Sequence, residues 1–375
     1  MELTSFKLTQ FKNYESQRID CSGGLTCFIG RNGMGKTNLL DAIYYLCMGK
    51  SYFNTPDSLI ARHGSDFFRL EGAFVRAGKT EQIVAKVIPR KKKELERNGL
   101  AYQRLSEHVG LLPVVMIAPD DTQLVSEGSE DRRRFLDNTL SQIGHQYLDQ
   151  LLLYNKLLKQ RNALLKQFGE KGRYDRAMVE VYDQQMLAPA AAITEARQQF
   201  MEAFRPKVRE AYRQISGQAE EVDCRYRSKL IDTPFETLLA EAAEKDRVLQ
   251  RSTVGPHRDD LQFSIGGYPL KRFASQGQLK SFVLSLKLAQ YQLLQEEKKL
   301  APLLLLDDIF DKLDQQRVQQ LLRLLRDSEF GQVFITDTDE ERLSRIIADT
   351  GQDFLKYRIT NGQAESINNH GGTGK

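Results

Sequence analysis

Gly30-Arg31-Asn32-Gly33-Met34-Gly35-Lys36-Thr37 is the stretch that decides the expected fold, because it matches the phosphate-binding pattern G-x-x-x-x-G-K-[ST]. A strand-like apolar run at residues 25–29 precedes it, and a helix-like stretch at residues 36–47 follows. The glycines let successive backbone N–H groups turn towards phosphates at the N-terminus of a helix. We therefore expect all eight residues to line a nucleotide site.

Two side chains of this loop have separate expected tasks. Lys36 reaches the β- and γ-phosphates of ATP, and the Thr37 hydroxyl binds Mg²⁺. The alternative is a glycine-rich turn that binds nothing. The strand before the loop and the helix after it favour the nucleotide site.

A second motif is the apolar run at residues 303–306, which is followed directly by Asp307 and Asp308. A buried central strand brings its C-terminal end beside the phosphate loop, where Asp307 can hold Mg²⁺. Asp308 would then orient or deprotonate the attacking water. Taken alone, such a run is more often a strand that meets a turn; together with the phosphate loop, it favours the catalytic interpretation.

A third motif, Ser275-Gln276-Gly277-Gln278, opens a helix predicted over residues 276–299. Ser275 is expected to cap this helix, and Ser275, Gly277 and Gln278 together could bind a γ-phosphate. The helix carries the chain about 35 Å away at ~1.5 Å per residue. The strand that ends at Asp307 returns at most about 17 Å. Unless Ser275 is only a cap, it therefore acts on the nucleotide of a second molecule.

Composition limits the class of protein. The 375 residues carry a net charge of +4, 41% hydrophobic residues and four cysteines without a C-x-x-C pair. This is the balance of a folded protein of two to three domains, and it excludes DNA binding by bulk charge alone. The longest apolar run, residues 301–306, is too short for a membrane span, and the N-terminus does not resemble a secretory signal. We expect a cytoplasmic protein without a disulfide framework or zinc site.

The predicted architecture is an α/β head, built from both ends of the chain, with an inserted helical lobe. Apolar spacing predicts one long helix over residues 129–167 and a second helical stretch to residue 215, interrupted at Pro189 and Pro206. The alternation of helices and strands after residue 276 predicts a largely parallel sheet. The expected parts are an N-terminal part of the head (1–127), the lobe (128–250) and a C-terminal part of the head (251–375).

Two basic segments are candidate DNA contacts. Arg90, Lys91, Lys92 and Lys93 stand at the end of a predicted hairpin, where four cations suit phosphate binding without sequence readout. The alternative is a solvated charge run. Arg132 and Arg133 belong to a run of three arginines that cannot share one helix face, so some are expected to pair with carboxylates such as Asp137.

The order of these motifs resembles the ABC-type ATPase heads of SMC and Rad50 proteins. Residues 311–314 look like the D-loop of such heads. The resemblance narrows to the RecF family, and four further stretches carry it: Phe11-Lys-Asn-Tyr14, Ala118-Pro-Asp-Asp121, Asp131-Arg-Arg-Arg-Phe-Leu-Asp137 and Val254-Gly-Pro-His-Arg-Asp-Asp260. The chain departs from the family at Tyr52 and Phe53, where a His-Arg pair is common. It also departs at residues 336–338, which contain no histidine for the switch position.

The resemblance implies an ABC-type ATPase head in which ATP closes two heads into a homodimer and slow hydrolysis, stimulated by DNA, reopens it. It further implies binding of gapped DNA and of junctions between duplex and single strand. Help in loading the RecA recombinase, with RecR and RecO as partners, follows from the same likeness.

The rival classes are a transporter ATPase, a nuclease-coupled repair ATPase, another SMC- or Rad50-like subunit and a small-molecule kinase. A transporter subunit would have a shorter gap between loop and signature and would need membrane partners. A nuclease would need a further metal-binding domain, and a kinase would lack the signature helix.

Overall fold

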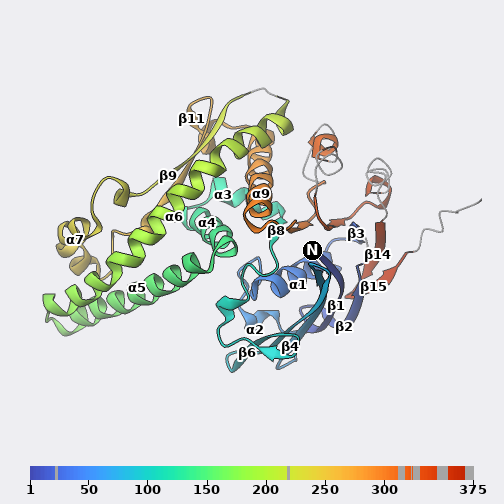
Figure 1. The fold of residues 1–375 in the computed structure, drawn as a ribbon, viewed down its shortest axis with the longest axis horizontal. Coiled ribbons are helices and arrows are strands. Elements are labelled where there is room, and N and C mark those ends of the chain that lie inside the picture. The colour runs from blue at the N-terminus through green and yellow to red at the C-terminus, as the bar shows by residue number, and fades with distance from the viewer. Residues whose placement is uncertain are drawn as a thin grey trace, which may run out of the picture. The chain divides into compact units, whose positions relative to one another are not determined.

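The computed structural model describes residues 1–21, 24–217, 220–310, 317–321, 323, 330–343 and 354–367. These residues form two compact units. Unit 1 consists of Met1–Asp121 and Gln290–Lys375, and unit 2 is Thr122–Ala289. Unit 1 therefore joins the two ends of the chain, drawn in blue and in red in Figure 1. The expected boundaries at residues 127 and 250 stay predictions.

An antiparallel sheet forms one layer of unit 1, in the order β2-β1-β4-β5-β6-β7. Side chains along β4 alternate between buried and partly exposed, as expected for a sheet with one face on a core. The alternation of residues 67–76 and 80–89 predicts a hairpin, and the structure confirms it as β4 and β5. The strands are β1 (Glu2–Phe11), β2 (Tyr14–Asp20), β4 (Phe68–Arg76), β5 (Lys79–Ile88), β6 (Lys92–Arg97) and β7 (Leu100–Ala101).

The second sheet of unit 1 has the order β15-β14-β3-β13-β12-β8 and is parallel except for the β14–β15 hairpin. Strands β3 and β12 are buried along their whole length, as expected for a parallel sheet covered on both faces. The expected parallel sheet is confirmed. The strands are β3 (Leu25–Ile29), β8 (Val114–Ile117), β12 (Leu303–Leu306), β13 (Val333–Asp337), β14 (Phe354–Thr360) and β15 (Gln363–Ser366).

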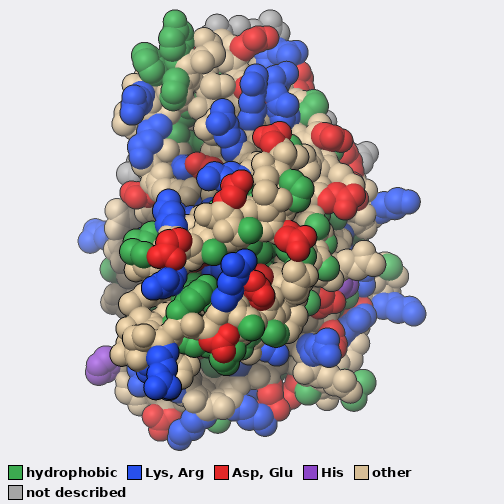
Figure 2. Space-filling view, turned by 90° about the vertical axis from the view of Figure 1, so that its left-hand side faces the viewer, with side chains coloured by type: hydrophobic (Ala, Val, Ile, Leu, Met, Phe, Trp, Pro, Cys, Tyr) green, Lys and Arg blue, Asp and Glu red, His purple; other side chains and the backbone are tan. Residues whose placement is uncertain are grey.

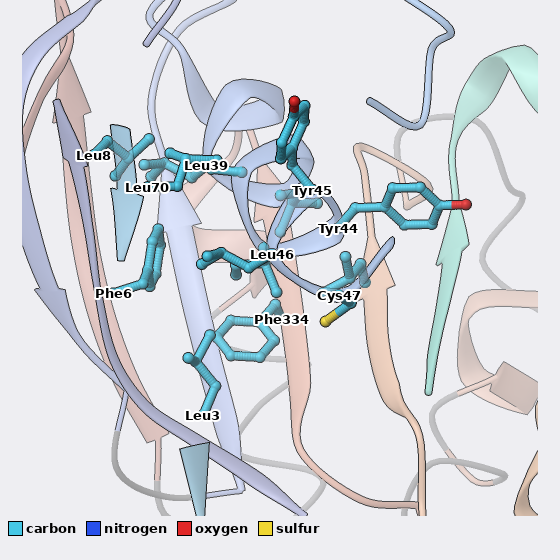
Figure 3. Packing of buried hydrophobic residues seen from close by; sticks show 14 of the residues in the cluster. Leu3, Phe6, Leu8, Leu39, Tyr44, Tyr45, Leu46, Cys47, Leu70 and Phe334 are labelled. Atoms are coloured by element: carbon cyan, nitrogen blue, oxygen red, sulfur yellow. The ribbon is translucent and has the colours of Figure 1, made fainter. Parts of the chain in front are cut away.

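Helix α1 (Lys36–Met48) packs against strands of both sheets. Eleven of its 13 residues are buried, so it is a helix covered on all sides. Figure 3 shows its Leu39, Tyr45 and Leu46 among Phe6 of β1, Leu70 of β4 and other apolar side chains. This burial fixes the helix whose N-terminus carries the phosphate loop.

Unit 2 is mainly helical. Helices α5 and α6 pack along each other, and a short connection joins them, so the expected pair of long helices is confirmed (Figure 1). Strands β9, β10 and β11 form a small antiparallel sheet. The elements are α3 (Gln123–Ser126), α4 (Ser129–Ile143), α5 (His145–Lys171), α6 (Arg176–Ser216), β9 (Val222–Arg227), α7 (Phe235–Leu249), β10 (Asp260–Ile265), β11 (Tyr268–Pro269) and α8 (Leu270–Phe273).

Two predictions about these helices are wrong. The helix expected over residues 129–167 breaks at Gly144, whose extended backbone ends α4 and precedes α5. Conversely, α6 continues through both Pro189 and Pro206. An internal proline costs a helix about 3 kcal/mol. The helix continues because its buried face, which includes Ile193 and Phe204, packs against the rest of unit 2.

The remaining elements connect the parts already described. Helix α9 (Gln276–Lys298) agrees with the predicted helix and runs from unit 2 into unit 1. Short elements are α2 (Asp57–Ile60) and the 3₁₀ turns Leu105–Glu107, Pro119–Thr122, Lys229–Ile231 and Pro256–Arg258. The D-loop-like residues 311–314 lie outside the described residues. Within the described ranges, no helix is long and apolar enough to cross a bilayer.

Candidate nucleotide site

The predicted phosphate loop lies between β3 and α1, as the sequence pattern requires. Gly33 and Gly35 have φ values of +81° and +111°, which favour glycine. A Cβ on Gly35 would also clash with the side chain of Asn13. The loop therefore needs glycine at position 35 for both its backbone conformation and its packing.

The β1–β2 turn holds this loop from one side. Asn13 donates a hydrogen bond from Nδ2 to the carbonyl oxygen of Met34 (2.9 Å), and its Oδ1 accepts from Asn38 (2.7 Å). The Tyr14 hydroxyl donates to the carbonyl oxygen of Gly35 (3.1 Å). The stretch 11–14, which the sequence flagged only by resemblance, thus supports the phosphate loop directly.

The β14–β15 turn, more than 300 residues later, supports the same loop. The Gly362 N–H donates to the carbonyl oxygen of Met34 at 3.2 Å. A Cβ on Gly30 would clash with the carbonyl oxygen of Ile359 on β14. The sequence did not predict these two contacts, because residues 359–362 have no pattern that points to the loop.

The Asp307 carboxylate meets the phosphate loop at its threonine. The Thr37 hydroxyl lies 2.8 and 3.0 Å from the two carboxylate oxygens of Asp307. The Thr336 hydroxyl at the end of β13 lies 2.8 Å from Oδ1 of the same carboxylate. The parallel register of β12 with β13 and β8 brings Asp307 to this edge of the sheet. The structure therefore brings together the two residues that the sequence predicts as Mg²⁺ ligands.

The electrostatics of Asp307 fit a cation site. Burial raises the pKa of Asp307 to about 6, against the opposing effects of the Thr336 and Thr37 hydroxyls and of Lys36. A bound divalent cation would favour the charged form. A hydroxyl and a carboxylate are also the oxygen ligands that Mg²⁺ prefers. Among the described residues, no group of three or more His, Cys, Asp or Glu side chains could hold a metal by itself, so a metal here needs phosphate or water ligands in addition.

Lys36 and Asp308 complete the cluster. The buried Lys36 ammonium donates to the carbonyl oxygen of Gly30 (2.9 Å) and lies 3.6 Å from Oδ2 of Asp308. Asp308 has a positive φ of 42°, which is costly for a non-glycine residue, and its N–H donates to the Thr336 hydroxyl (2.9 Å). This strained turn keeps the second carboxylate beside the phosphate loop.

A buried polar cluster lies behind the loop. Asp41 of α1 pairs with Lys12 of the β1–β2 turn (2.7 Å) and accepts hydrogen bonds from the Ser51 hydroxyl and the Tyr52 N–H (both 2.8 Å). The Tyr52 hydroxyl in turn donates to Asp121. Tyr52, one of the departures from the family pattern, is therefore part of the packing of unit 1.

The signature residues lie in unit 2, at the start of α9. Ser275 and Gln278 form a capping box: the Ser275 N–H donates to Gln278 Oε1 (2.7 Å), and the Gln278 N–H donates to Ser275 Oγ (3.3 Å). Gln278 Nε2 also donates to Glu220 (2.6 Å). Ser275 is exposed and Gly277 partly so. The capping role is confirmed; contact with a γ-phosphate stays a prediction.

The described contacts of the arginine run are internal to unit 2. Arg132 forms a bidentate pair with Asp260 (2.7 and 3.2 Å), and Arg133 donates to the carbonyl oxygen of Asp259 (2.8 Å). Arg134 pairs with Asp131. The expectation that some of these arginines pair with carboxylates is confirmed, although Asp137 is not their partner. DNA binding by Arg132 and Arg133 stays a prediction.

Asp137 instead joins a buried network centred on Arg197 of α6. Arg197 pairs with Asp137 and with Asp259, each at 2.8 Å, and donates to the carbonyl oxygen of Pro256 (2.9 Å). His257 lies beside this network: its Nε2 donates to the Ser252 carbonyl oxygen, so its Nδ1 accepts from a tyrosine hydroxyl. Burial lowers the pKa of His257 to about 4. The stretch 254–260 is thus a structural turn of unit 2.

The basic hairpin consists of β5 and β6 of unit 1, and residues 90–93 lie in its turn and at the start of β6. Arg90, Lys91 and Lys92 are exposed at its tip. Lys93 is partly buried, pairs with Asp57 (3.0 Å) and lies over the Tyr45 ring. On the face of the molecule drawn in Figure 2, basic and acidic side chains are interspersed. On this face a phosphate-binding surface would therefore be a local cluster, as the net charge predicts.

Comparison with known proteins agrees with this geometry. A family profile described as "RecF/RecN/SMC N terminal domain" matches residues 2–356. The chain is 42% identical to the DNA replication and repair protein RecF of Flavobacterium johnsoniae, over 96% of this chain and 100% of the relative. It is 41% identical to the RecF of Parabacteroides distasonis, over 98% and 100% of the two chains.

Solved structures give the same result. The recombination mediator RecF bound to ATP superposes with a TM-score of 0.88 at 28% identity, over 98% of this chain and 97% of that one. An SMC head bound to the C-terminal winged-helix domain of ScpA superposes with a TM-score of 0.57 at 16% identity, covering 98% and 97%, and supports the fold alone.

The phosphate loop, the strand that ends in Asp307 and the sheet order define an ATPase head of the ABC and SMC class. Within that class, the chain belongs to the RecF family.

Proposed function

We propose that this chain is an ATP-dependent DNA-binding protein of DNA replication and recombinational repair. The observation that carries the proposal is the contact of Thr37 with Asp307 beside Lys36, because it assembles the parts of an ATP site from the two ends of the chain. The names of the relatives, which are DNA replication and repair proteins, supply the biological process.

In this proposal the residues of the site have separate tasks. The Lys36 ammonium exchanges its present contact with the Gly30 carbonyl oxygen for the β- and γ-phosphates of ATP. Thr37 and Asp307 would hold Mg²⁺, which neutralises charge on those phosphates. Asp308, already turned towards Lys36, orients the attacking water.

The signature acts on the nucleotide of a second chain. Helix α9 has 23 residues and carries Ser275 about 35 Å from the end that precedes β12. Ser275 is exposed, and as the cap of α9 it lies where the helix dipole favours an anion. These features support a homodimer in which ATP lies between the Lys36 of one chain and the Ser275 of the other.

ATP binding would then close the dimer and slow hydrolysis would reopen it, so the enzyme would act as a switch on DNA. Gapped DNA and junctions of duplex with single strand are the proposed substrates. The RecF–ATP structure is described as part of the RecFOR pathway, which supports RecR and RecO as partners in loading the recombinase.

A mixing experiment tests the shared site. One variant carries Lys36→Ala and another carries Ser275→Arg, and each alone is expected to be nearly inactive in ATP turnover. In a mixed dimer, one site combines both defects and the other is intact. About half the dimers in an equimolar mixture are mixed, so turnover should recover to about a quarter of the parental rate if the sites act independently.

The control is a mixture of the Lys36→Ala variant with the parent, and tagged chains verify that subunits exchange. If exchanged dimers of the two variants show no recovery while the control mixture keeps activity in its mixed dimers, Ser275 is only a helix cap. If both mixtures are silent, the two sites are obligately coupled.

A further inference from the structure

One motif of unit 2 has a side chain that the buried network does not use. In the stretch 254–260, Asp259 pairs with Arg197 and Asp260 pairs with Arg132, while His257 is enclosed. The Arg258 side chain is exposed. Of the residues that the structure describes, none forms an ion pair or hydrogen bond with its guanidinium.

Arg258 lines a pocket of about 570 Å³ that lies entirely within unit 2. Two further exposed cations, Arg227 at the end of β9 and Lys229 in the following turn, line the same pocket. Neither has an ion-pair partner within the described parts of the chain. Three cations therefore surround one concavity without a protein counter-charge of their own.

The carboxylates in the wall of this pocket do not provide that counter-charge. Asp259 accepts hydrogen bonds from Arg197 and Tyr226, and Asp260 is held by both nitrogens of the Arg132 fork. Asp260 is also the cross-strand neighbour of Arg227, yet its oxygens face Arg132. Only Asp232, on the rim, is an exposed acid of the lining.

The fold holds Arg258 in place. Gly255 has a φ of 126°, and a side chain there would clash with the Tyr154 hydroxyl, so the turn requires glycine. The 3₁₀ turn that follows is closed by the Arg258 N–H, which donates to the Gly255 carbonyl oxygen (2.8 Å).

We propose that the pocket formed by Arg227, Lys229 and Arg258 binds the phosphate backbone of a DNA strand. The inference rests on the proposed function, since it assigns part of the DNA contact to unit 2. The volume is in the range of pockets that enclose a small ligand, so the pocket takes one nucleotide unit rather than a length of duplex.

The lining favours a nucleotide unit over an acidic peptide. Two of the three cations are arginines, whose planar fork matches a phosphate in two hydrogen bonds. Leu230, Ile231 and Val254 add an apolar side to the wall that suits a sugar or base. One or two adjacent phosphates would meet the three cations.

The test measures DNA affinity against salt concentration by fluorescence anisotropy, with ATP present, on gapped duplex and on single-stranded oligonucleotides. The full-length variant carries Arg227→Gln, Lys229→Gln and Arg258→Gln. A matched control carries Lys156→Gln, Lys159→Gln and Lys166→Gln, three exposed lysines of α5 in the same unit. DNA affinity falls as salt rises, so the slope of log K against log salt is negative. Each lost contact between a phosphate and a cation makes this slope less negative by about 0.9 on duplex or about 0.7 on single strands.

The expected result is that the slope of the pocket variant is less negative than that of the parent by the amount for one or two phosphate contacts. The slope of the control variant should equal that of the parent. An equal slope in pocket variant and parent overturns the inference, whereas a parent that binds no DNA overturns the proposed function itself. Two further arms identify other occupants. If pocket substitutions instead remove binding of poly-L-glutamate, the partner is an acidic protein segment. If ATP still binds to a Lys36→Ala chain and the pocket substitutions remove that binding, the occupant of the pocket is a free nucleotide. Each of these two results also overturns the inference.

Discussion

The two units treat their charged residues in opposite ways. In unit 1, Lys36, Thr37, Asp307 and Asp308 converge on the edge of a sheet, where they contact one another, the backbone of a glycine-rich loop and Thr336. In unit 2, Arg161 and Arg197 are buried and Arg132 is partly buried, and all three pair with carboxylates from distant parts of the chain. The comparison teaches that conspicuous charged motifs can have different uses. In the proposed ATP site, the first set exchanges its partners for a ligand, whereas the second set joins helices and turns within unit 2.

The largest expected effect comes from a change in the phosphate loop of unit 1. Lys36→Ala should abolish ATP binding, because it removes the ammonium that reaches the β- and γ-phosphates. Calorimetry measures the affinity, and Lys159→Ala, an exposed lysine of α5, is the control with the same change. Parental affinity in the Lys36 variant would contradict the phosphate-loop assignment.

Asp308→Asn should leave ATP bound and slow its turnover by about 10²- to 10⁴-fold, the usual contribution of a positioned acid or base. The amide keeps the shape of the side chain but loses the charge that accepts a proton from water. A phosphate-release assay measures turnover, and sedimentation in ATP should show an accumulated dimer. Unchanged turnover would make Asp308 a turn residue.

Arg197→Met tests the unit 2 side. Removal of one partner from a buried ion network leaves Asp137 and Asp259 without their cation, and such a loss costs about 3–5 kcal/mol. Arg176→Met, which breaks an exposed pair with Glu180, should cost about 0.5 kcal/mol or less. Urea unfolding followed by circular dichroism compares the two; equal costs would show that the Arg197 network does not stabilise unit 2.

The raised pKa of Asp307 gives a smaller, pH-dependent effect. Below a pKa of about 6, protonation of the free site competes with Mg²⁺, so the Mg²⁺-dependent part of ATP affinity should fall about tenfold per pH unit. Above that pH the carboxylate is charged and this contribution is constant. ATP itself also titrates, so Asp307→Asn is the reference, and its Mg²⁺ dependence should lack this component.

The smallest expected effect concerns the basic hairpin of unit 1. Neutralising Arg90, Lys91, Lys92 and Lys93 together should lower the salt slope of duplex binding by about 0.9 for each phosphate that these cations neutralise in the parent. Because Lys93 already pairs with Asp57, the single change Lys93→Gln should contribute less than Lys91→Gln. A slope equal to that of the parent would mean that the run is solvated and unused.

Local sequence patterns were enough to predict the residues proposed for the chemistry of the site. They were not enough to predict the residues that hold the site in place. The loop at residues 30–37 and the apolar strand before Asp307 are short stretches with their own signals, and the structure brings both together. Asn13, Gly362 and Thr336 hold the same site through contacts across the fold. Such contacts cannot be predicted from residue spacing, because the sequence does not indicate which group a side-chain amide or a backbone N–H will bind.

The class of site and the α/β head can be predicted from the sequence alone, because a phosphate loop needs glycines, a preceding strand and a following helix in continuous order. The course of the helices and the partners of the arginines depend on contacts that form only in the folded chain. Helix α6 passes two prolines because its buried contacts outweigh their local cost, and the predicted long helix ends at Gly144. Arg132 pairs with Asp260, 128 residues away, because the fold brings this carboxylate beside the partly buried guanidinium.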